Sequence, residues 1–573
     1  MKDGFIKVKS VSPDIICGDV ENNCDKIIHE IIIADEEKVN VVLFPELSLV
    51  GFTCGDLVFS DLILSSAVEC LKKICNATKE LYPIAIVGVP FVYRSKLYNT
   101  AAVIHRGKIL GIVPKTNLPN YLGFCEKRYF QSSCDLPENA SICIDEENDN
   151  IPFSSNIVFT SSILPDFTFG VELCEDLWAP LSPSTKLCLG GAAIMFNCSA
   201  SPEIIGKASQ RKSYIGALSS RFICGYVYSN AGITEDCSSN VYSGHRLIYE
   251  CGSILSEGAA FDTDSDCIAN IDVKKISFLR RLNTSFKINE SGMRYVQFDQ
   301  KSICTSLLQP IYMNPFTKDR AEISPALFNY ISQIQINALA NRLVQGKFEG
   351  LCFNCRGVYS DVHSLFIISK AFEKVGFTKE KSFIYFNNSQ MKEILSELCK
   401  AFDLCIVYDN NSIPDENVLY LQDDDLNRYA TKEMTFIGKH IYSINHSLSE
   451  SLLIKYSRYI IKNYQKDFSD KLIISNDNDA ERDFYEFILY YTVRFGFKPS
   501  KIIRLAETAY KDIYSSEELK NMARAFYTEF FSNQSTRNKM PNGVKVGSVS
   551  LCSKGDYLIP EFPSVQLYLK DIK

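Results

Sequence analysis

The sequence has few histidines, and no apolar run long enough to cross a membrane. Its six histidines form no HxH or HExxH pattern, so the spacing typical of a zinc site is missing. Its apolar runs, such as residues 41–44, have the length of a strand, whereas a membrane helix needs about 20 apolar residues. The first residues contain no apolar segment that could act as a secretion signal. These absences predict a cytoplasmic protein without a structural or catalytic metal.

A strong excess of one charge is also missing. The 573 residues include 61 Lys+Arg and 68 Asp+Glu, a formal net charge of −7. Proteins that bind nucleic acid or anionic membranes usually show a basic excess, so neither partner is expected. The 46% of hydrophobic residues is typical of a globular protein. The length is sufficient for two or three domains.

Cysteine is abundant but shows no disulfide or zinc pattern. The 21 cysteines are dispersed over the whole chain, unlike the dense cysteines of small secreted domains. The one CxxC, formed by Cys352 and Cys355, has no second CxxC to complete a zinc site. We therefore interpret these two cysteines as residues of a strand. Any cysteine can still be a nucleophile, so each is judged by its neighbours in the sequence.

Alternating helical and strand patterns predict the first domain. Residues 1–275 combine apolar helix faces, as in residues 22–37, with short apolar strands, as in residues 41–44. This alternation predicts a mixed α/β domain whose chemistry lies at strand ends. Residues 276–325 are irregular and include Pro310 and Pro315, which predicts a linker.

Residues 326–573 predict a second α/β domain. A first helix is followed by an apolar strand at residues 351–355 and by a helix that ends at Gly376, a residue typical of helix C-termini. Strand, helix and strand in succession predict an open parallel sheet. The acidic run at residues 423–425 is expected in a solvated loop.

Three residues whose side chains could act in catalysis follow apolar strands at sharp bends. Glu46 follows a strand and a proline, Lys115 follows Pro114, and Cys174 follows the apolar residues 169–173. A partly desolvated carboxylate can act as a general base. An ammonium group near a thiol stabilises the thiolate and an oxyanion. Each motif alone fits an ordinary strand end, but together, in the order Glu, Lys, Cys, they predict an amidase with a cysteine nucleophile.

These motifs resemble the Glu-Lys-Cys triad of the nitrilase (carbon–nitrogen hydrolase) superfamily. Further segments narrow the resemblance to the family of glutamine-dependent NAD⁺ synthetases, and they occur in both halves of the chain. They are FPELSL (44–49), TCGDL (53–57), PKT (114–116), LPNY (118–121), EKR (126–128), CEDLW (174–178), SASP (199–202), SGH (243–245), FFSNQ (530–534) and PNGVKVGSVS (541–550).

The resemblance implies the fold and the roles of the triad. It implies an α/β chain: a nitrilase-like α-β-β-α sandwich, followed by an open parallel-sheet domain of the adenine nucleotide alpha hydrolase type. Glu46 would be the base, Lys115 the oxyanion partner and Cys174 the nucleophile. Glu126 would be a supporting acid near the cysteine.

Three further residues match positions near the family's glutamine site. These residues are Tyr121, Ser201 and Lys207. The resemblance implies that they touch the amino and carboxylate groups of the substrate. It also implies that glutamine hydrolysis needs no cofactor.

The second domain departs from the family at its ATP site. The family holds the pyrophosphate of ATP on a Ser-Gly-Gly-x-Asp-Ser loop, where backbone N–H groups must approach the phosphates closely. At this place the chain reads RGVYSD over residues 356–361, with a single glycine and two bulky residues. The family's Gly-Thr-Gly-Asp-x-Ser-Glu segment has no counterpart. The sequence therefore predicts a folded second domain without synthetase activity.

The leading hypothesis is a cysteine amidohydrolase that releases ammonia from glutamine. Its second domain would serve assembly or docking, a partner synthetase would accept the ammonia, and the chain would form a homo-oligomer. One alternative is a complete glutamine-dependent NAD⁺ synthetase, which would use ATP and Mg²⁺ to convert deamido-NAD⁺ to NAD⁺. A second alternative is a non-catalytic regulatory subunit of a synthetase. A third is an amidase for another small amide.

Overall fold

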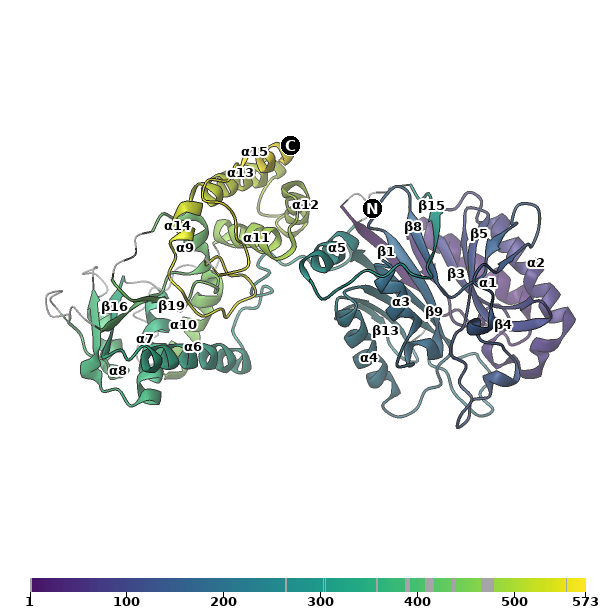
Figure 1. The fold of residues 1–573 in the computed structure, drawn as a ribbon, viewed down its shortest axis with the longest axis horizontal. Coiled ribbons are helices and arrows are strands. Elements are labelled where there is room, and N and C mark those ends of the chain that lie inside the picture. The colour runs from purple at the N-terminus through teal and green to yellow at the C-terminus, as the bar shows by residue number, and fades with distance from the viewer. Residues whose placement is uncertain are drawn as a thin grey trace. The chain divides into compact units, whose positions relative to one another are not determined.

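The computed structural model describes residues 3–572, apart from residues 263–264, 302, 304–305, 357–358, 387–391, 408–416, 435, 437, 465–478 and 553. The chain divides into two compact units, Met1–Gln309 and Pro310–Lys573 (Figure 1). Each unit has its own hydrophobic core and is described by itself.

Two mixed β-sheets form the centre of the first unit. The six strands of one sheet follow the order β14 (Cys267–Asp272), β1 (Phe5–Ser10), β2 (Val41–Leu43), β3 (Ile84–Tyr93), β4 (Lys96–His105) and β5 (Lys108–Pro114). The seven strands of the other follow the order β13 (Ser253–Gly258), β12 (Arg246–Glu250), β11 (Gly225–Asn230), β10 (Ile194–Ser199), β9 (Thr168–Leu173), β8 (Ile157–Ser161) and β15 (Arg294–Phe298). A small separate pair joins β6 (Ser141–Ile142) to β7 (Ile151–Pro152).

The two sheets pack face to face because their strands are apolar on both faces. In β2, Val41 and Leu43 belong to the core between the sheets, together with Phe196 of β10 and Val227 of β11. The intervening Val42 points the other way, into the core shared with helices. Since side chains alternate along a strand, a continuous apolar run is what a strand covered on both faces requires.

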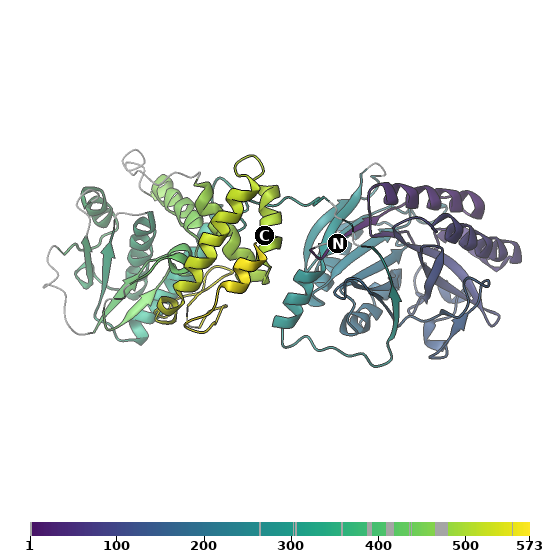
Figure 2. The same cartoon turned by 90° about the horizontal axis from the view of Figure 1, so that it is seen from above.

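Helices cover the outer faces of both sheets. The helices α1 (Val20–Glu36) and α2 (Asp61–Ala77) share a core with the sheet that contains β2, and Figure 2 shows them side by side along one side of the unit, in purple. The helices α3 (Pro183–Leu189) and α4 (Lys207–Arg221) share a core with the other sheet. The layers are therefore α-β-β-α, which confirms the predicted sandwich.

The predicted linker at residues 276–325 is more ordered than the sequence analysis expected. Part of it belongs to the helix α5 (Val273–Leu282), and β15 pairs in parallel with β8 and forms the edge of that sheet. The pairing adds Phe298 to the core between the sheets. The first unit therefore continues to Gln309, beyond the predicted boundary at residue 275, because an irregular sequence can still complete the edge of a sheet.

The second unit contains the predicted open parallel sheet. Its four parallel strands follow the order β17 (Ser382–Phe386), β16 (Gly350–Cys355), β18 (Val418–Gln422) and β19 (Ile441–Ser443). Cys352 and Cys355 are buried residues of β16, as the sequence indicated. The helices around the sheet and in the C-terminal part are α6 (Pro325–Gln345), α7 (Tyr359–Val375), α8 (Lys392–Ala401), α9 (Leu426–Thr431), α10 (Glu450–Tyr464), α11 (Ala480–Phe495), α12 (Pro499–Ala509), α13 (Ser516–Ser532), α14 (Gln534–Asn538) and α15 (Gln566–Asp571).

The acidic run at residues 423–425 is buried, so its assignment to a solvated loop is wrong. All three carboxylates have partners that offset the cost of burial. Asp423 and Asp424 form ion pairs with Arg356, and Asp425 accepts hydrogen bonds from the Arg428 backbone N–H at 2.9 Å and from the Tyr359 hydroxyl at 2.8 Å. Arg356 and Tyr359 come from a distant part of the chain, which a local sequence pattern does not reveal.

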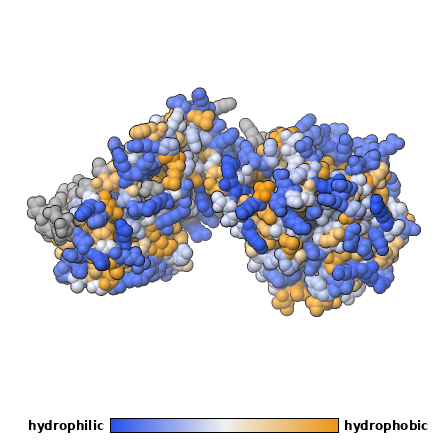
Figure 3. All heavy atoms as spheres, in the orientation of Figure 1, coloured by the Kyte–Doolittle hydropathy of each residue, from blue (hydrophilic) through white to orange (hydrophobic). Residues whose placement is uncertain are grey.

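The surface is predominantly polar. Hydrophilic side chains cover most of the face seen in Figure 3, with apolar residues scattered among them. Among the described residues, no helix is both long enough and apolar enough to span a bilayer.

Candidate active site

Glu46 lies in a tight turn directly after β2. Leu47, the next residue, has a positive φ of 50°, and the turn packs against Gly88 of β3. A Cβ atom on Gly88 would lie 2.3 Å from the Leu47 nitrogen and 2.3 Å from the Pro45 oxygen. Only glycine permits this approach. The sheet therefore holds the Glu46 side chain in one place, fully buried.

Lys115 links two carboxylates inside the unit. Its Nζ lies 2.6 Å from Oε1 of Glu46 and 2.7 Å from Oε1 of Glu126. Asn99, on the neighbouring strand β4, donates a hydrogen bond from Nδ2 to the same Glu46 oxygen at 2.7 Å. All four side chains are buried. The structure thus brings together Glu46, Lys115 and Glu126, which are far apart in the sequence.

The electrostatics of this group follow from burial and opposite charge. Burial alone would lower the pKa of Lys115, but Glu126, Glu46 and Cys174 raise this pKa well above its usual value. Burial raises the pKa of Glu126 to about 7; Lys115 opposes this shift and Glu46 adds to it. The lysine is therefore a permanent cation at neutral pH, held between two carboxyl groups.

Cys174 lies at the sharp bend that follows β9. It is the first residue of the 3₁₀ turn η4 (Cys174–Leu177), and its φ of +40° is unusual for a residue with a side chain. Its backbone N–H donates to Oδ1 of Asn197 on β10 at 3.2 Å. Burial, followed by the negative charge of Glu46, raises the pKa of the thiol, and Lys115 opposes the shift. The resting group is therefore a neutral thiol that needs a base.

Two carboxylate oxygens near Cys174 are buried without a hydrogen-bond partner among the described residues. They are Oε2 of Glu46 and Oε2 of Glu126. A buried acceptor without a donor is costly, and such groups concentrate at functional sites. The free oxygen of Glu46 can accept a proton from a thiol or from water.

Of the three residues assigned to the glutamine head group, Tyr121 and Lys207 lie near Cys174. The Tyr121 hydroxyl donates to Oε1 of Glu175 at 2.6 Å, and Tyr121 is 51% exposed. Lys207 begins α4, and its Nζ lies 3.9 Å from the centroid of the Trp178 ring. Burial and Arg211 lower the pKa of Lys207, whereas Cys174 raises it, which places the ammonium near the thiol. Ser201 is buried.

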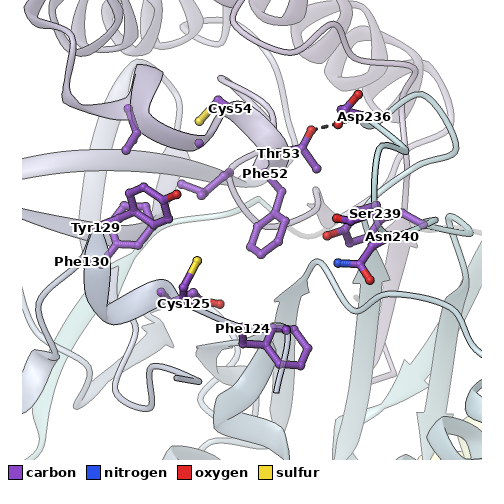
Figure 4. Close-up of a pocket in the computed structure, with 16 residues that line it drawn as sticks. Phe52, Thr53, Cys54, Phe124, Cys125, Tyr129, Phe130, Asp236, Ser239 and Asn240 are labelled. Carbon is purple, nitrogen blue, oxygen red and sulfur yellow. Dashed lines mark hydrogen bonds between the residues drawn. The ribbon is translucent and has the colours of Figure 1, made fainter. Parts of the chain in front are cut away.

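A cavity of about 240 Å³ adjoins this group. Glu126 lines it, and so does Tyr242, whose pKa is raised by burial, by Glu235 and by the negative charges of Cys174, Glu46 and Glu126. Figure 4 shows the lining residue Phe52 between Tyr129 and Phe130 on one side and Ser239 and Asn240 on the other. A small substrate can therefore reach the buried group from this side.

The sequence analysis missed the residues that support the group. Asn99 and Asn197 each bond to a triad member, but neither stands in a recognisable motif. Only the pairing of β4 with β3 and β5, and of β10 with β9, brings them there. Asp176 belongs to the CEDLW segment, but the sequence alone assigns it no role.

In the second unit, charged side chains at the described strand ends pair with one another. Arg356 follows β16, and its guanidinium is already paired with Asp423 and Asp424, which follow β18. The charges of these three side chains therefore offset one another in part. The described residues contain no group of three or more potential ligands that could hold a metal ion. Gly357 and Val358 of the predicted loop lie outside the described residues.

Comparisons with known proteins match both halves of the chain. Residues 7–281 match the carbon-nitrogen hydrolase family. A glutamine-dependent NAD(+) synthetase of Mycobacterium leprae is 25% identical over 671 residues, which cover 100% of this chain and 98% of that protein. The glutamine-dependent NAD(+) synthetase of Aquifex aeolicus is 31% identical over 248 residues, which cover 43% of this chain and 39% of that protein.

A solved structure also aligns along the chain. The glutamine-dependent NAD(+) synthetase from Cytophaga hutchinsonii covers 99% of this chain and 100% of its own, with a TM-score of 0.41 and 15% sequence identity. The alignment with the Mycobacterium leprae protein is longer than the 573 residues of this chain, so that relative contains segments that this chain lacks.

Proposed function

We propose that the protein hydrolyses the side-chain amide of glutamine at Cys174, because residues 7–281 match the carbon–nitrogen hydrolase family and the whole chain resembles glutamine-dependent NAD⁺ synthetases. The observation that carries the proposal is the buried Glu46–Lys115–Glu126 group beside this thiol. The free Oε2 of Glu46 gives the thiol its base. A non-catalytic subunit would have no need of this arrangement.

In the first half of the reaction, Glu46 activates Cys174. Oε2 of Glu46 takes the thiol proton, and the sulfur attacks the amide carbon. An ammonium group has three N–H donors; two of those on Lys115 point to carboxylates, and we assign the third to the oxyanion. The C–N bond then breaks, Glu46 returns its proton to the leaving nitrogen, and ammonia departs from a γ-glutamyl thioester.

The second half hydrolyses the thioester. Glu46 takes a proton from water, and the hydroxide attacks the thioester carbonyl while Lys115 again stabilises the oxyanion. The C–S bond breaks, the proton returns to sulfur, and glutamate leaves. Glu126 stays paired with Lys115 throughout and keeps the ammonium between base and nucleophile.

Glutamine as the amide substrate is supported by residues near Cys174. Lys207 can pair with the α-carboxylate of an amino acid, and Tyr121 and Glu175 together present a hydroxyl and a carboxylate to an α-ammonium group. The names of the relatives point to the same substrate. A small amide without these head groups would leave their contacts unmade.

Replacing Glu46 by glutamine is expected to lower the turnover number. The variant keeps the size of the side chain but cannot accept the thiol proton, so the rate should fall about 10²-fold or more. The measurement is ammonia release from glutamine under saturating conditions. The matched control is Glu69→Gln, which alters an exposed ion pair with Lys72 and should keep the full rate. A wild-type rate in Glu46→Gln would remove this residue from the mechanism.

A complete glutamine-dependent NAD⁺ synthetase is the second candidate. The similarity over the full length of the Mycobacterium leprae protein favours it over a glutaminase alone. The pairing of Arg356 with Asp423 and Asp424 favours glutamine hydrolysis without NAD⁺ synthesis, called here the narrower function. In the narrower function, the ammonia passes to a partner synthetase, the second unit serves docking or assembly, and the chain forms a homo-oligomer.

Thermal melting with ATP separates the two candidates. Because Arg356 and its carboxylates neutralise each other, we expect no increase in the melting temperature with millimolar Mg-ATP. A ligand at a hundredfold excess over its Kd would add about 2.7 kcal/mol to the free energy of unfolding. We also expect no NAD⁺ from deamido-NAD⁺, ATP and ammonia. An ATP-dependent increase together with NAD⁺ formation would establish the complete synthetase.

A further inference from the structure

One buried carboxylate joins the two strand ends that carry Lys115 and Cys174. Asp176 lies in η4 and is 1% exposed. Its Oδ1 accepts hydrogen bonds from the Asn117 backbone N–H at 2.7 Å and from Asn117 Nδ2 at 2.8 Å. Its Oδ2 accepts from the backbone N–H of Thr116 at 3.3 Å and from that of Leu173 at 3.3 Å. Four donors therefore converge on one side chain.

The backbone donors to Oδ2 of Asp176 lie next to Lys115 and Cys174 in the chain. Thr116 directly follows Lys115, and Leu173 directly precedes Cys174. Lys115 follows β5 and Cys174 follows β9, and these strands belong to different sheets. Contacts between the two sheets are mainly apolar and non-directional. The Asp176 hydrogen bonds are directional, so they can fix the spacing of the two chain segments more closely than the apolar core does.

We propose that Asp176 is a positioning residue that sets the distance between the Lys115 ammonium and the Cys174 sulfur. The inference rests on the proposed function, in which this ammonium must meet the oxyanion formed at the sulfur. Asp176 itself touches neither the substrate nor the reacting atoms in this scheme. It acts through Thr116–Asn117 on one side and through Leu173 on the other.

The chemistry of the contact requires an ionised carboxylate. A carboxylate only accepts hydrogen bonds, which matches four N–H donors. An asparagine in its place would turn an NH₂ group toward two of these N–H donors. At least one hydrogen bond would be lost, and the Thr116–Asn117 segment would move away from Leu173. Burial raises the pKa of Asp176 to about 6, whereas the N–H groups of Asn117, the Lys115 charge and the Thr116 N–H lower it.

The test compares Asp176→Asn with a matched variant elsewhere. Asp145 also holds a turn by accepting from the Asn148 backbone at 2.8 Å, from Asn148 Nδ2 at 3.1 Å and from the Glu147 backbone at 3.0 Å. Asp145→Asn removes the same kind of contact but borders neither Lys115 nor Cys174. In both full-length variants, kcat and KM for glutamine, the melting temperature and the alkylation rate of Cys174 by iodoacetamide are measured.

A positioning role predicts a specific pattern. A displacement of about 1 Å can cost about 10²-fold in rate, so kcat of Asp176→Asn should fall by about this factor while KM changes less than about threefold. Alkylation of Cys174 should also slow, because the thiolate loses its cation. Asp145→Asn should match the wild type in kcat, KM and the alkylation rate. Asn117→Ala, which removes a single donor, should fold and lose about tenfold in kcat.

The outcomes separate this inference from the proposed function. Asp176→Asn and Asn117→Ala could both show the wild-type kcat and alkylation rate while Cys174→Ala is inactive. This result would overturn the positioning role and leave the proposed function intact. If Asp176→Asn fails to melt cooperatively, Asn117→Ala decides alone. Activity in Cys174→Ala would overturn the proposed function, while the alkylation rates would still test the spacing.

Discussion

Replacing Cys174 by alanine is expected to abolish ammonia release from glutamine. The residue supplies the sulfur that forms the covalent intermediate, and removal of a nucleophile commonly costs about 10⁴-fold or more. The side chain is small and 7% exposed, so the variant should fold with nearly the stability of the wild type. Ammonia and glutamate are measured together after incubation with glutamine.

Two other cysteines give the control for this result. Cys352 and Cys355 are buried strand residues of the second unit, and alanine in either place should leave glutamine hydrolysis nearly unchanged. Their loss of stability is expected in the range of an ordinary core substitution. Near-wild-type hydrolysis by Cys174→Ala would exclude covalent catalysis at this residue.

Replacing Lys115 by alanine is expected to affect both rate and stability. The rate of glutamine hydrolysis should fall by about 10³-fold, because the oxyanion loses its cation. The free energy of unfolding should fall by about 3–5 kcal/mol, since Glu46 and Glu126 are left buried without their partner. Rate assays and urea unfolding of the full-length variant measure the two effects.

The stability loss of this variant should depend on pH. Burial already raises the pKa of Glu126, and Lys115 opposes the shift; without the lysine this pKa rises further. The folded state then binds a proton that the unfolded state releases, so stability is kept at pH 5 and falls as the pH rises through the raised pKa. Lys212→Ala, which breaks a surface ion pair with Glu257, should show neither effect. A stability loss in Lys115→Ala that is equal at pH 5 and pH 8 would contradict this explanation.

The three residues proposed as the triad could be singled out from the sequence because their motifs are local. Glu46, Lys115 and Cys174 each follow an apolar strand, and such strands are recognisable from a few consecutive residues. The carboxyl ends of the strands then bring the three side chains to one place. The sandwich could be predicted for the same reason, because strands that are apolar on both faces must be buried on both faces.

The contacts that depend on distant pairing could not be located from the sequence. Asn99 reaches Glu46 only because β4 pairs with β3 in one register. Residues 423–425 resemble a solvated loop in sequence, and they are buried because Arg356 provides an opposite charge from a position 67 residues away from Asp423. The strand β15 shows little apolar pattern of its own, since it forms a partly exposed edge of its sheet.

The most direct test of glutamine hydrolysis at Cys174 is mass spectrometry of the acid-quenched enzyme. The wild-type protein is mixed with glutamine, quenched during turnover, digested and mapped. The mechanism predicts a γ-glutamyl group on the peptide that contains Cys174, absent from the Cys174→Ala variant, with ammonia released before glutamate. Ammonia released without an adduct on Cys174, or an adduct on another cysteine, would contradict it.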